Sequence, residues 1–97
     1  MDSLVEGPDS EAERRIAEVA QAHGSRLDLT SLRLAAVPDS IGQLTALTSL
    51  DLHDNQLTAI PDSIGQLTAL TELFLHDNQL TAIPDSIGQL KIGRAHV

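Results

Sequence analysis

A repeat of 23 residues constrains the fold of this chain more than any other feature. Residues 44–66 and 67–89 are two copies in tandem that differ at only two positions. A third, more diverged copy precedes them, with its apolar residues one period earlier. Because a fixed period of this length is typical of repeat architectures, we expect one structural unit per copy, stacked on its neighbours.

Each copy combines a short strand with a short helical turn. Around Leu50 and Leu52 apolar and polar residues alternate, which is the pattern of a strand with one buried face. Pro61 then suits the first position of one helical turn, and Gly65 suits its end. A single coil of this kind cannot bury its own apolar side, so we expect stacked coils whose strands pair in parallel at about 4.8 Å.

An asparagine interrupts the apolar series at the same place in both copies, at Asn55 and Asn78. We expect each amide to be enclosed where the chain turns from the strand to the convex side. There it can hydrogen-bond backbone groups of its own coil and of the neighbouring coil. A surface turn is the alternative, but the constant spacing from the flanking leucines favours the enclosed position.

The segments LTSLDLHDNQLTAIPDSI and LTELFLHDNQLTAIPDSI follow the pattern LxxLxLxxNxLxxIPxxI. In this they resemble the intracellular subtype of the leucine-rich repeat family, and the resemblance extends over residues 27–90. It implies an α/β solenoid with parallel strands on a concave face, short helical turns on a convex face, and partner binding by the concave face. The first copy departs from the pattern, because Leu32 replaces the asparagine and Gly24 replaces the leading leucine. This departure suggests a terminal coil.

A capping helix is predicted before the repeats. Ser10 and Glu13 have the spacing of a capping box, and apolar residues then recur at helical spacing. We predict an amphipathic helix over residues 10–23 that covers the first coil with Ile16. A membrane-surface helix is the alternative, but the polar face mixes acidic and basic residues. Residues 1–9 are expected to be disordered.

The repeat pattern stops after Leu90. Residues 91–97, KIGRAHV, match the translation of a common sequencing adapter, so we interpret them as a non-native tail and leave them out of the fold prediction. The repeats would then occupy residues 24–90, about three coils, truncated at the C-terminal end. The uncovered last coil would expose aliphatic side chains, so we expect the isolated fragment to be marginally stable or to self-associate through this end.

Composition and motifs exclude several functions. The formal charge is −8 and Lys and Arg are not clustered, so we expect no binding of nucleic acid or of a membrane. The chain has no cysteine and no start that resembles a signal peptide, from which we predict a cytoplasmic protein. Motifs of phosphate loops, zinc proteases and serine hydrolases are absent, so we predict no enzyme and no cofactor.

An alternative function comes from the resemblance. In some members of the family such repeats precede GTPase, kinase or ubiquitin-ligase domains. The chain could then be the N-terminal sensing segment of a larger, truncated enzyme, and the sequence beyond Leu90 would decide between the two interpretations.

We place the candidate binding site on the concave face, at strand and turn residues whose side chains do not point inward. These residues are Arg26, Asp28, Ser49, Asp51, His53, Asp54, Glu72, Phe74, His76 and Asp77. Both differences between the two copies, Ser49 against Glu72 and Asp51 against Phe74, lie on this face, which suggests that partners are distinguished there. The aspartates favour a basic or polar protein partner, and Phe74 favours an apolar pocket on it.

His53 with Asp54, and His76 with Asp77, form a repeated pair that could present imidazoles and carboxylates to a metal ion. A zinc site needs three or four converging ligands, whereas equivalent residues of stacked coils run in parallel. We therefore predict no metal site at these residues.

Overall fold

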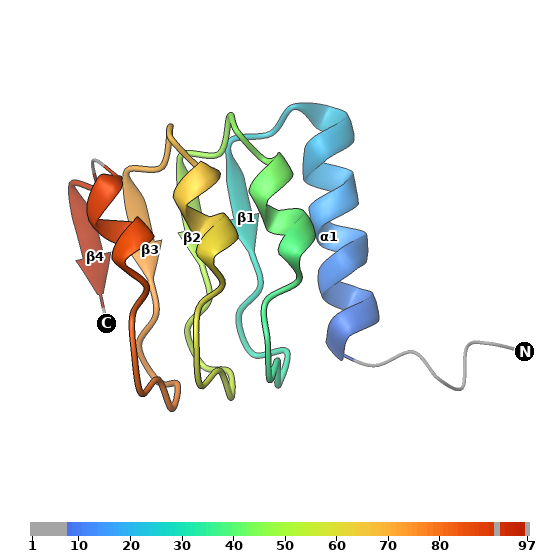
Figure 1. Cartoon of the computed structure of the whole chain (residues 1–97). Helices are drawn as coiled ribbons and strands as arrows, with labels where there is room; N and C mark the ends of the chain where they lie inside the picture. Colours follow the sequence, from blue (N-terminus) through green and yellow to red (C-terminus); the bar gives the residue numbers. More distant parts are fainter. Residues whose placement is uncertain (1–7, 91, 97) are drawn as a thin grey trace, which may run out of the picture.

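The computed structural model describes residues 8–90 and 92–96 (Figure 1). Within these residues one α-helix precedes a parallel sheet whose strands are neighbours in chain order, with a 3-10 helix between successive strands. The elements are α1 (Pro8–Ala22), β1 (Arg26–Asp28), η2 (Asp39–Gln43), β2 (Ser49–Asp51), η3 (Asp62–Gln66), β3 (Glu72–Phe74), η4 (Asp85–Gln89) and β4 (Arg94–His96). The strands lie on one side and the 3-10 helices on the other, which confirms the predicted solenoid.

The register of the sheet repeats the period of the sequence. Leu27, Leu50 and Leu73 are paired across β1, β2 and β3, and all three are buried. The other fully buried large side chains are also aliphatic: Leu29, Leu34, Ile41, Leu47, Leu52, Leu57, Ile64, Leu67 and Leu70. Since full burial of one such side chain contributes about 1.5–3 kcal/mol, the stacking of leucine on leucine is the main source of stability.

Helix α1 covers the apolar end of the first coil. Ala12 and Ile16 are buried between the helix and the coil. A polar contact fixes the helix to η2, since the Ser40 hydroxyl donates to Oε1 of Glu13 over 2.7 Å. Within the described ranges no helix, α1 included, is long and apolar enough to cross a membrane.

The bounds of α1 differ from the predicted helix. It begins at Pro8 rather than Ser10, so Ser10 is not the N-cap and the predicted capping box is wrong. Proline favours the first helical turn because its missing N–H would have no helical partner there. The helix ends at Ala22, and His23 follows with a left-handed φ of 52°. Residues 1–7, which belong to the segment predicted to be disordered, lie outside the described residues.

The proline of each repeat precedes the 3-10 helix instead of opening it. Pro61 is extended, with φ −70° and ψ 152°, and its carbonyl oxygen accepts the first helical bond from the N–H of Ile64 over 3.1 Å. The predicted place of proline is therefore wrong by one residue. Gly65 lies inside η3, and no glycine of residues 8–90 and 92–96 has a positive φ. Backbone conformation is thus not the reason for glycine at this position.

Residues 94–96, which the fold prediction left out, form β4 and pair in parallel with β3. The N–H of Gly93 donates to the carbonyl of Thr71 over 2.9 Å, as the N–H of Thr71 does to the carbonyl of Thr48 over 2.8 Å. Pairing of this kind needs only backbone groups at an open strand edge, so it does not depend on the repeat pattern. The non-native origin of residues 91–97 stays a prediction.

The last coil is less covered than the inner coils. Ile83 is 42% exposed, whereas Ile60 at the equivalent position of the previous coil is 5% exposed. The difference arises because η3 is packed against η4, while no further coil is packed against Ile83 in the described part of the chain. Self-association through this end stays a prediction.

Candidate functional site

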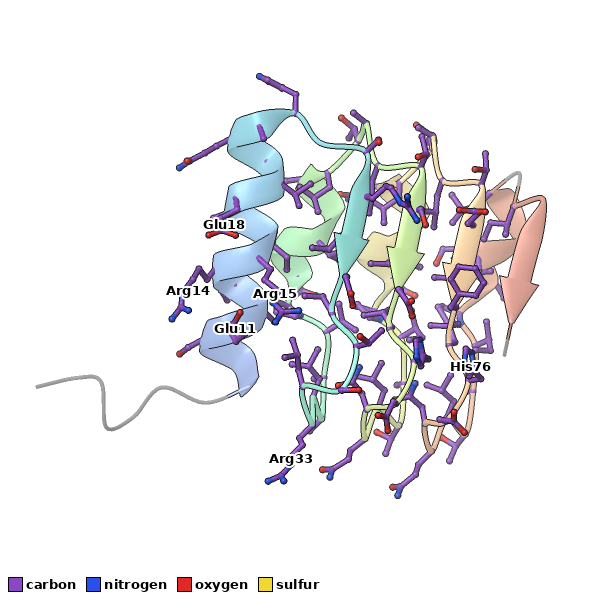
Figure 2. All side chains as sticks on the ribbon, turned by 180° about the vertical axis from the view of Figure 1, so that it is seen from behind. Glu11, Arg14, Arg15, Glu18, Arg33 and His76 are labelled. Atoms are coloured by element: carbon purple, nitrogen blue, oxygen red, sulfur yellow. The ribbon has the colours of Figure 1, made fainter. Side chains whose placement is uncertain are left out.

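The concave face consists of the outward-facing residues of the strands and of the turns that follow them (Figure 2). Parallel register places equivalent residues of successive coils side by side, about 4.8 Å apart. The first row holds Arg26, Ser49 and Glu72, and the second holds Asp28, Asp51 and Phe74. By the same period, the third row holds Thr30, His53 and His76.

Hydrogen bonds join the second row to the third within the first two coils. Oδ1 of Asp28 accepts from the N–H and the hydroxyl of Thr30, over 2.9 and 2.7 Å. Oδ1 of Asp51 accepts from the N–H of His53 over 3.2 Å and also contacts Nδ1 of its ring. Each aspartate thus fixes the residue two positions later, as in an Asx turn. In the third coil Phe74 takes the place of the carboxylate.

The pKa of Asp28 lies below its ordinary value of 3.8. The largest cause is the hydrogen bond from the Thr30 hydroxyl, followed by the bond from the Thr30 N–H, while partial burial acts in the opposite direction. The nearby charges of Arg15 and His53 lower this pKa further. Asp28 is therefore a charged group of the concave face throughout the neutral pH range.

Replacement of Asp28 by asparagine is expected to reduce the acid sensitivity of the fold. Because the folded-state pKa is depressed, the ionised carboxylate stabilises the fold above the unfolded pKa, and this contribution is lost as pH falls through the folded pKa. Asp28→Asn should melt at a lower temperature than the parent at neutral pH, and the difference should shrink below about pH 4. Thermal melts followed by circular dichroism across this range measure it, and a constant difference would contradict the argument.

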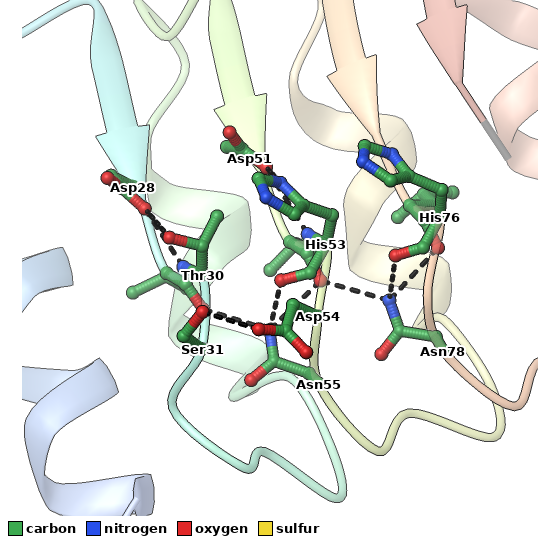
Figure 3. A network of polar contacts seen from close by, with 12 residues as sticks. Asp28, Thr30, Ser31, Asp51, His53, Asp54, Asn55, His76 and Asn78 are labelled. Carbon is green, nitrogen blue, oxygen red and sulfur yellow. Dashed lines mark hydrogen bonds and ion pairs between the residues drawn. The ribbon is translucent and has the colours of Figure 1, made fainter.

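The rings of His53 and His76 are stacked, with centroids 4.4 Å apart and an angle of 6° between the planes. Figure 3 shows the two rings side by side, with Asp51 next to the His53 ring. Parallel rings direct their nitrogens alongside one another, so the two residues do not converge on a common point as metal ligands do. Among the described residues no group of three or more His, Asp or Glu is placed to hold a metal ion.

The turns after the strands place Asp54 and Asp77 in the left-handed conformation, with φ of 60° and 58°. Aspartate tolerates this region better than most residues. Ser31, the equivalent residue of the first coil, has φ of 57°, and its hydroxyl donates to Oδ2 of Asp54 over 2.7 Å. The predicted residues Asp54 and Asp77 therefore lie beyond the strand ends, at the margin of the concave face.

Asn55 is enclosed as predicted, whereas Asn78, in the last coil, is half-buried. Asn55 is 7% exposed, and its Oδ1 accepts from the N–H groups of Leu32 and Leu34, each over 3.0 Å. Its Nδ2 donates to the carbonyls of Leu29 and Leu52, each over 2.9 Å. One side chain thus satisfies backbone groups of two coils.

The predicted binding residues differ in access. Arg26 and Asp28 are exposed, whereas a larger group is half-buried: Asp51, His53, Glu72, Phe74 and His76. Ser49 is only 8% exposed, because it lies in register between the longer side chains of Arg26 and Glu72. It therefore offers a partner little area. Binding by all of the predicted residues stays a prediction.

Two residues outside the predicted binding set shape this face. Thr30 binds the carboxylate of Asp28, and Arg15 reaches the sheet from α1, where its Nη1 donates to the carbonyl of Asp28 over 2.9 Å. Nε of Arg15 also donates to Oε2 of Glu11 over 2.8 Å. The spacing of Glu11 and Arg15, one helical turn apart, is a sequence signal that indicates this pair.

Comparison with known proteins identifies the family. The family model described as leucine rich repeat matches residues 25–80, which is more than half of the chain. The chain belongs to the leucine-rich repeat family. No curated protein matches it.

Two solved structures show the same architecture. A leucine-rich repeat protein of Leptospira interrogans is 39% identical, with a TM-score of 0.75 over 79% of this chain and 20% of that one. The leucine-rich repeat domain of the type III effector XopL is 26% identical, with a TM-score of 0.71 over 89% of this chain and 31% of that one. The chain thus spans less than a third of either structure. It is a repeat module of a kind commonly used for protein interaction.

Proposed function

We propose that this chain is a protein-binding module that holds a partner on its concave face and performs no catalysis itself. The observation that carries the proposal is the position of the two differences between otherwise identical coils. Ser49 and Glu72 are partners in the strand register, as are Asp51 and Phe74, and both pairs lie on the concave face. All convex and loop positions of the two coils are the same.

The chemistry of this face supports recognition of a protein. Phe74 is a half-buried aromatic side chain in register with Asp51 on β2, and Glu72 lies two residues earlier on β3. An aromatic side chain among polar residues is typical of an interface hot spot. The absence of cysteine is consistent with a reducing compartment, and we place this binding in the cytoplasm. The sensing segment of a larger enzyme remains the alternative, with no residue of this chain in its favour.

Replacement of Phe74 by alanine is expected to weaken partner binding by about 2 kcal/mol, roughly 30-fold in Kd, because the apolar anchor is lost. The ligands for this measurement are peptides selected against the intact chain from a random displayed library, with Kd measured by calorimetry. Ile83→Ala is the matched control, since Ile83 is 42% exposed but lies outside the sheet. Binders that are insensitive to Phe74→Ala while the variant loses thermal stability would show a structural role only.

A further inference from the structure

The third row of the concave face carries an aromatic ring in the second and third coils, but not in the first. His53 and His76 occupy equivalent places in successive coils and stack at 4.4 Å, close to the spacing of neighbouring strands. The first coil carries Thr30 at this place. Backbone pairing continues through this region, since the N–H of Leu29 donates to the carbonyl of Asp51 over 2.9 Å. The face of the His53 ring directed towards the first coil therefore meets a short side chain instead of a third ring.

The carboxylate of Asp28 lies beside the Thr30 side chain. Oδ1 of Asp28 accepts both hydrogen bonds from Thr30, and within residues 8–90 and 92–96 no hydrogen bond or ion pair engages its Oδ2. Asp28 is exposed, and its lowered pKa keeps it charged at neutral pH. The space over the Thr30 side chain is therefore bordered by the face of the His53 ring and by the accessible Oδ2 of Asp28.

The surrounding charges are mixed, with carboxylates in excess. Asp51 contacts the His53 ring, and Asp54 accepts from the Ser31 hydroxyl, so both anions lie on the same side of the sheet. Arg15 is directed to the carbonyl of Asp28 and to Glu11, and Arg26 lies two residues before Asp28 on β1. These two cations reduce the attraction for a positive ligand, so charge alone does not define the site.

We propose that the concave face binds an arginine side chain of a protein partner above Thr30, with the guanidinium stacked on the His53 ring and paired with the Asp28 carboxylate. The inference rests on the proposed function and names the partner's chemistry. A guanidinium is both planar and cationic, so it can occupy the place of the missing ring and donate to a carboxylate at the same time. A lysine ammonium is cationic but has no planar face, and an uncharged planar group such as a ureido can donate to the carboxylate but lacks the charge that strengthens this bond.

The probe for this inference is the blocked tripeptide acetyl-Gly-Arg-Gly-amide, titrated into the full chain at pH 7.5. Binding is followed by NMR through the imidazole protons of His53 and His76. The analogues with lysine and with citrulline in place of arginine separate charge from planarity. We expect the arginine peptide to bind at least about threefold more tightly than either analogue and to perturb His53 more than His76.

Two variants and one control test the geometry. Asp28→Asn removes the ionic partner and should weaken arginine binding about fivefold. Thr30→His places a third ring in the row, as the second and third coils already do. It should weaken arginine binding about tenfold while preserving the fold. Asp62→Asn removes an exposed carboxylate from η3 on the opposite side and should leave the affinity unchanged.

Equal affinity for the three peptides, or no response to Thr30→His, would overturn the inference. These outcomes differ from failure of the proposed function. If library-selected peptides depend on Phe74 but show no enrichment of arginine and no response to Thr30→His, the concave face binds partners without an arginine site. If no selected peptide depends on any concave residue, the proposed function itself fails.

Discussion

Replacement of Asn55 by alanine is expected to lower the free energy of unfolding by about 3 kcal/mol, roughly 1 kcal/mol for each backbone group that is left without a partner. Three groups depend on this amide: the N–H groups of Leu32 and Leu34, and the carbonyl of Leu29. The amide also donates to the carbonyls of Leu52 and His53, but these keep bonds from Asn78 and from the N–H of Ser31. Because Asn55 is only 7% exposed, water cannot easily replace it. Urea unfolding followed by circular dichroism measures the loss.

Asn78→Ala is the matched control for this variant. Asn78 accepts from the N–H of Leu57 over 3.0 Å and donates to the carbonyls of Leu52 and Leu75, but it is half-buried rather than buried. Water can reach its partners more readily, so we expect about half the loss seen for Asn55→Ala. Equal losses for the two variants would contradict the argument from water access. A loss below about 1 kcal/mol for Asn55→Ala would show that the asparagine amides are not a principal support of the stack.

The sequence predicts the stacking of this chain well because the same physical requirement recurs in every coil. Leu50 and Leu73 must face the core together, since a shift of one residue would turn a whole strand inside out. Asn55 is predictable for the same reason, because its spacing from the leucines leaves its amide inside the turn. Because each coil repeats the same core positions, one chain shows the same pattern several times, and this makes the prediction secure.

Features that depend on one coil or one end are not predictable in this way. The start of α1 at Pro8 follows from a local preference that competes with the capping signal at Ser10. The pairing of residues 94–96 uses backbone groups only, so no side-chain pattern indicates it. In the candidate site, the spacing of His53 and His76 is visible in the sequence, but the parallel orientation of their rings requires side-chain torsions that a period does not fix.

The glycines of η2 and η3 are explained by their contacts and not by their backbone conformation. Gly65 does not have a positive φ, so the turn itself would accept alanine. A Cβ added at Gly65 would instead lie 2.7 Å from Cβ of Ser86 in the next coil. At Gly42 the corresponding distance to Cβ of Ser63 is 3.1 Å. Glycine is therefore required by the close approach of successive 3-10 helices.

Gly65→Ala is accordingly expected to destabilise the fold by about 3 kcal/mol, because the added methyl group forces η3 and η4 apart along the stacked core. Gly88→Ala is the matched control, because a Cβ there meets no described atom within 4 Å. Alanine should change stability little, or raise it by up to about 1 kcal/mol because it lowers the conformational entropy of the unfolded chain. Ser86→Gly added to Gly65→Ala removes the clashing atom and should recover part of the loss, which a double-mutant cycle measured by urea unfolding isolates. Similar losses of stability at Gly65 and Gly88, or no recovery in the double variant, would contradict this explanation. The destabilisation by alanine would then arise within the 3-10 helix and not from contact with the neighbouring coil.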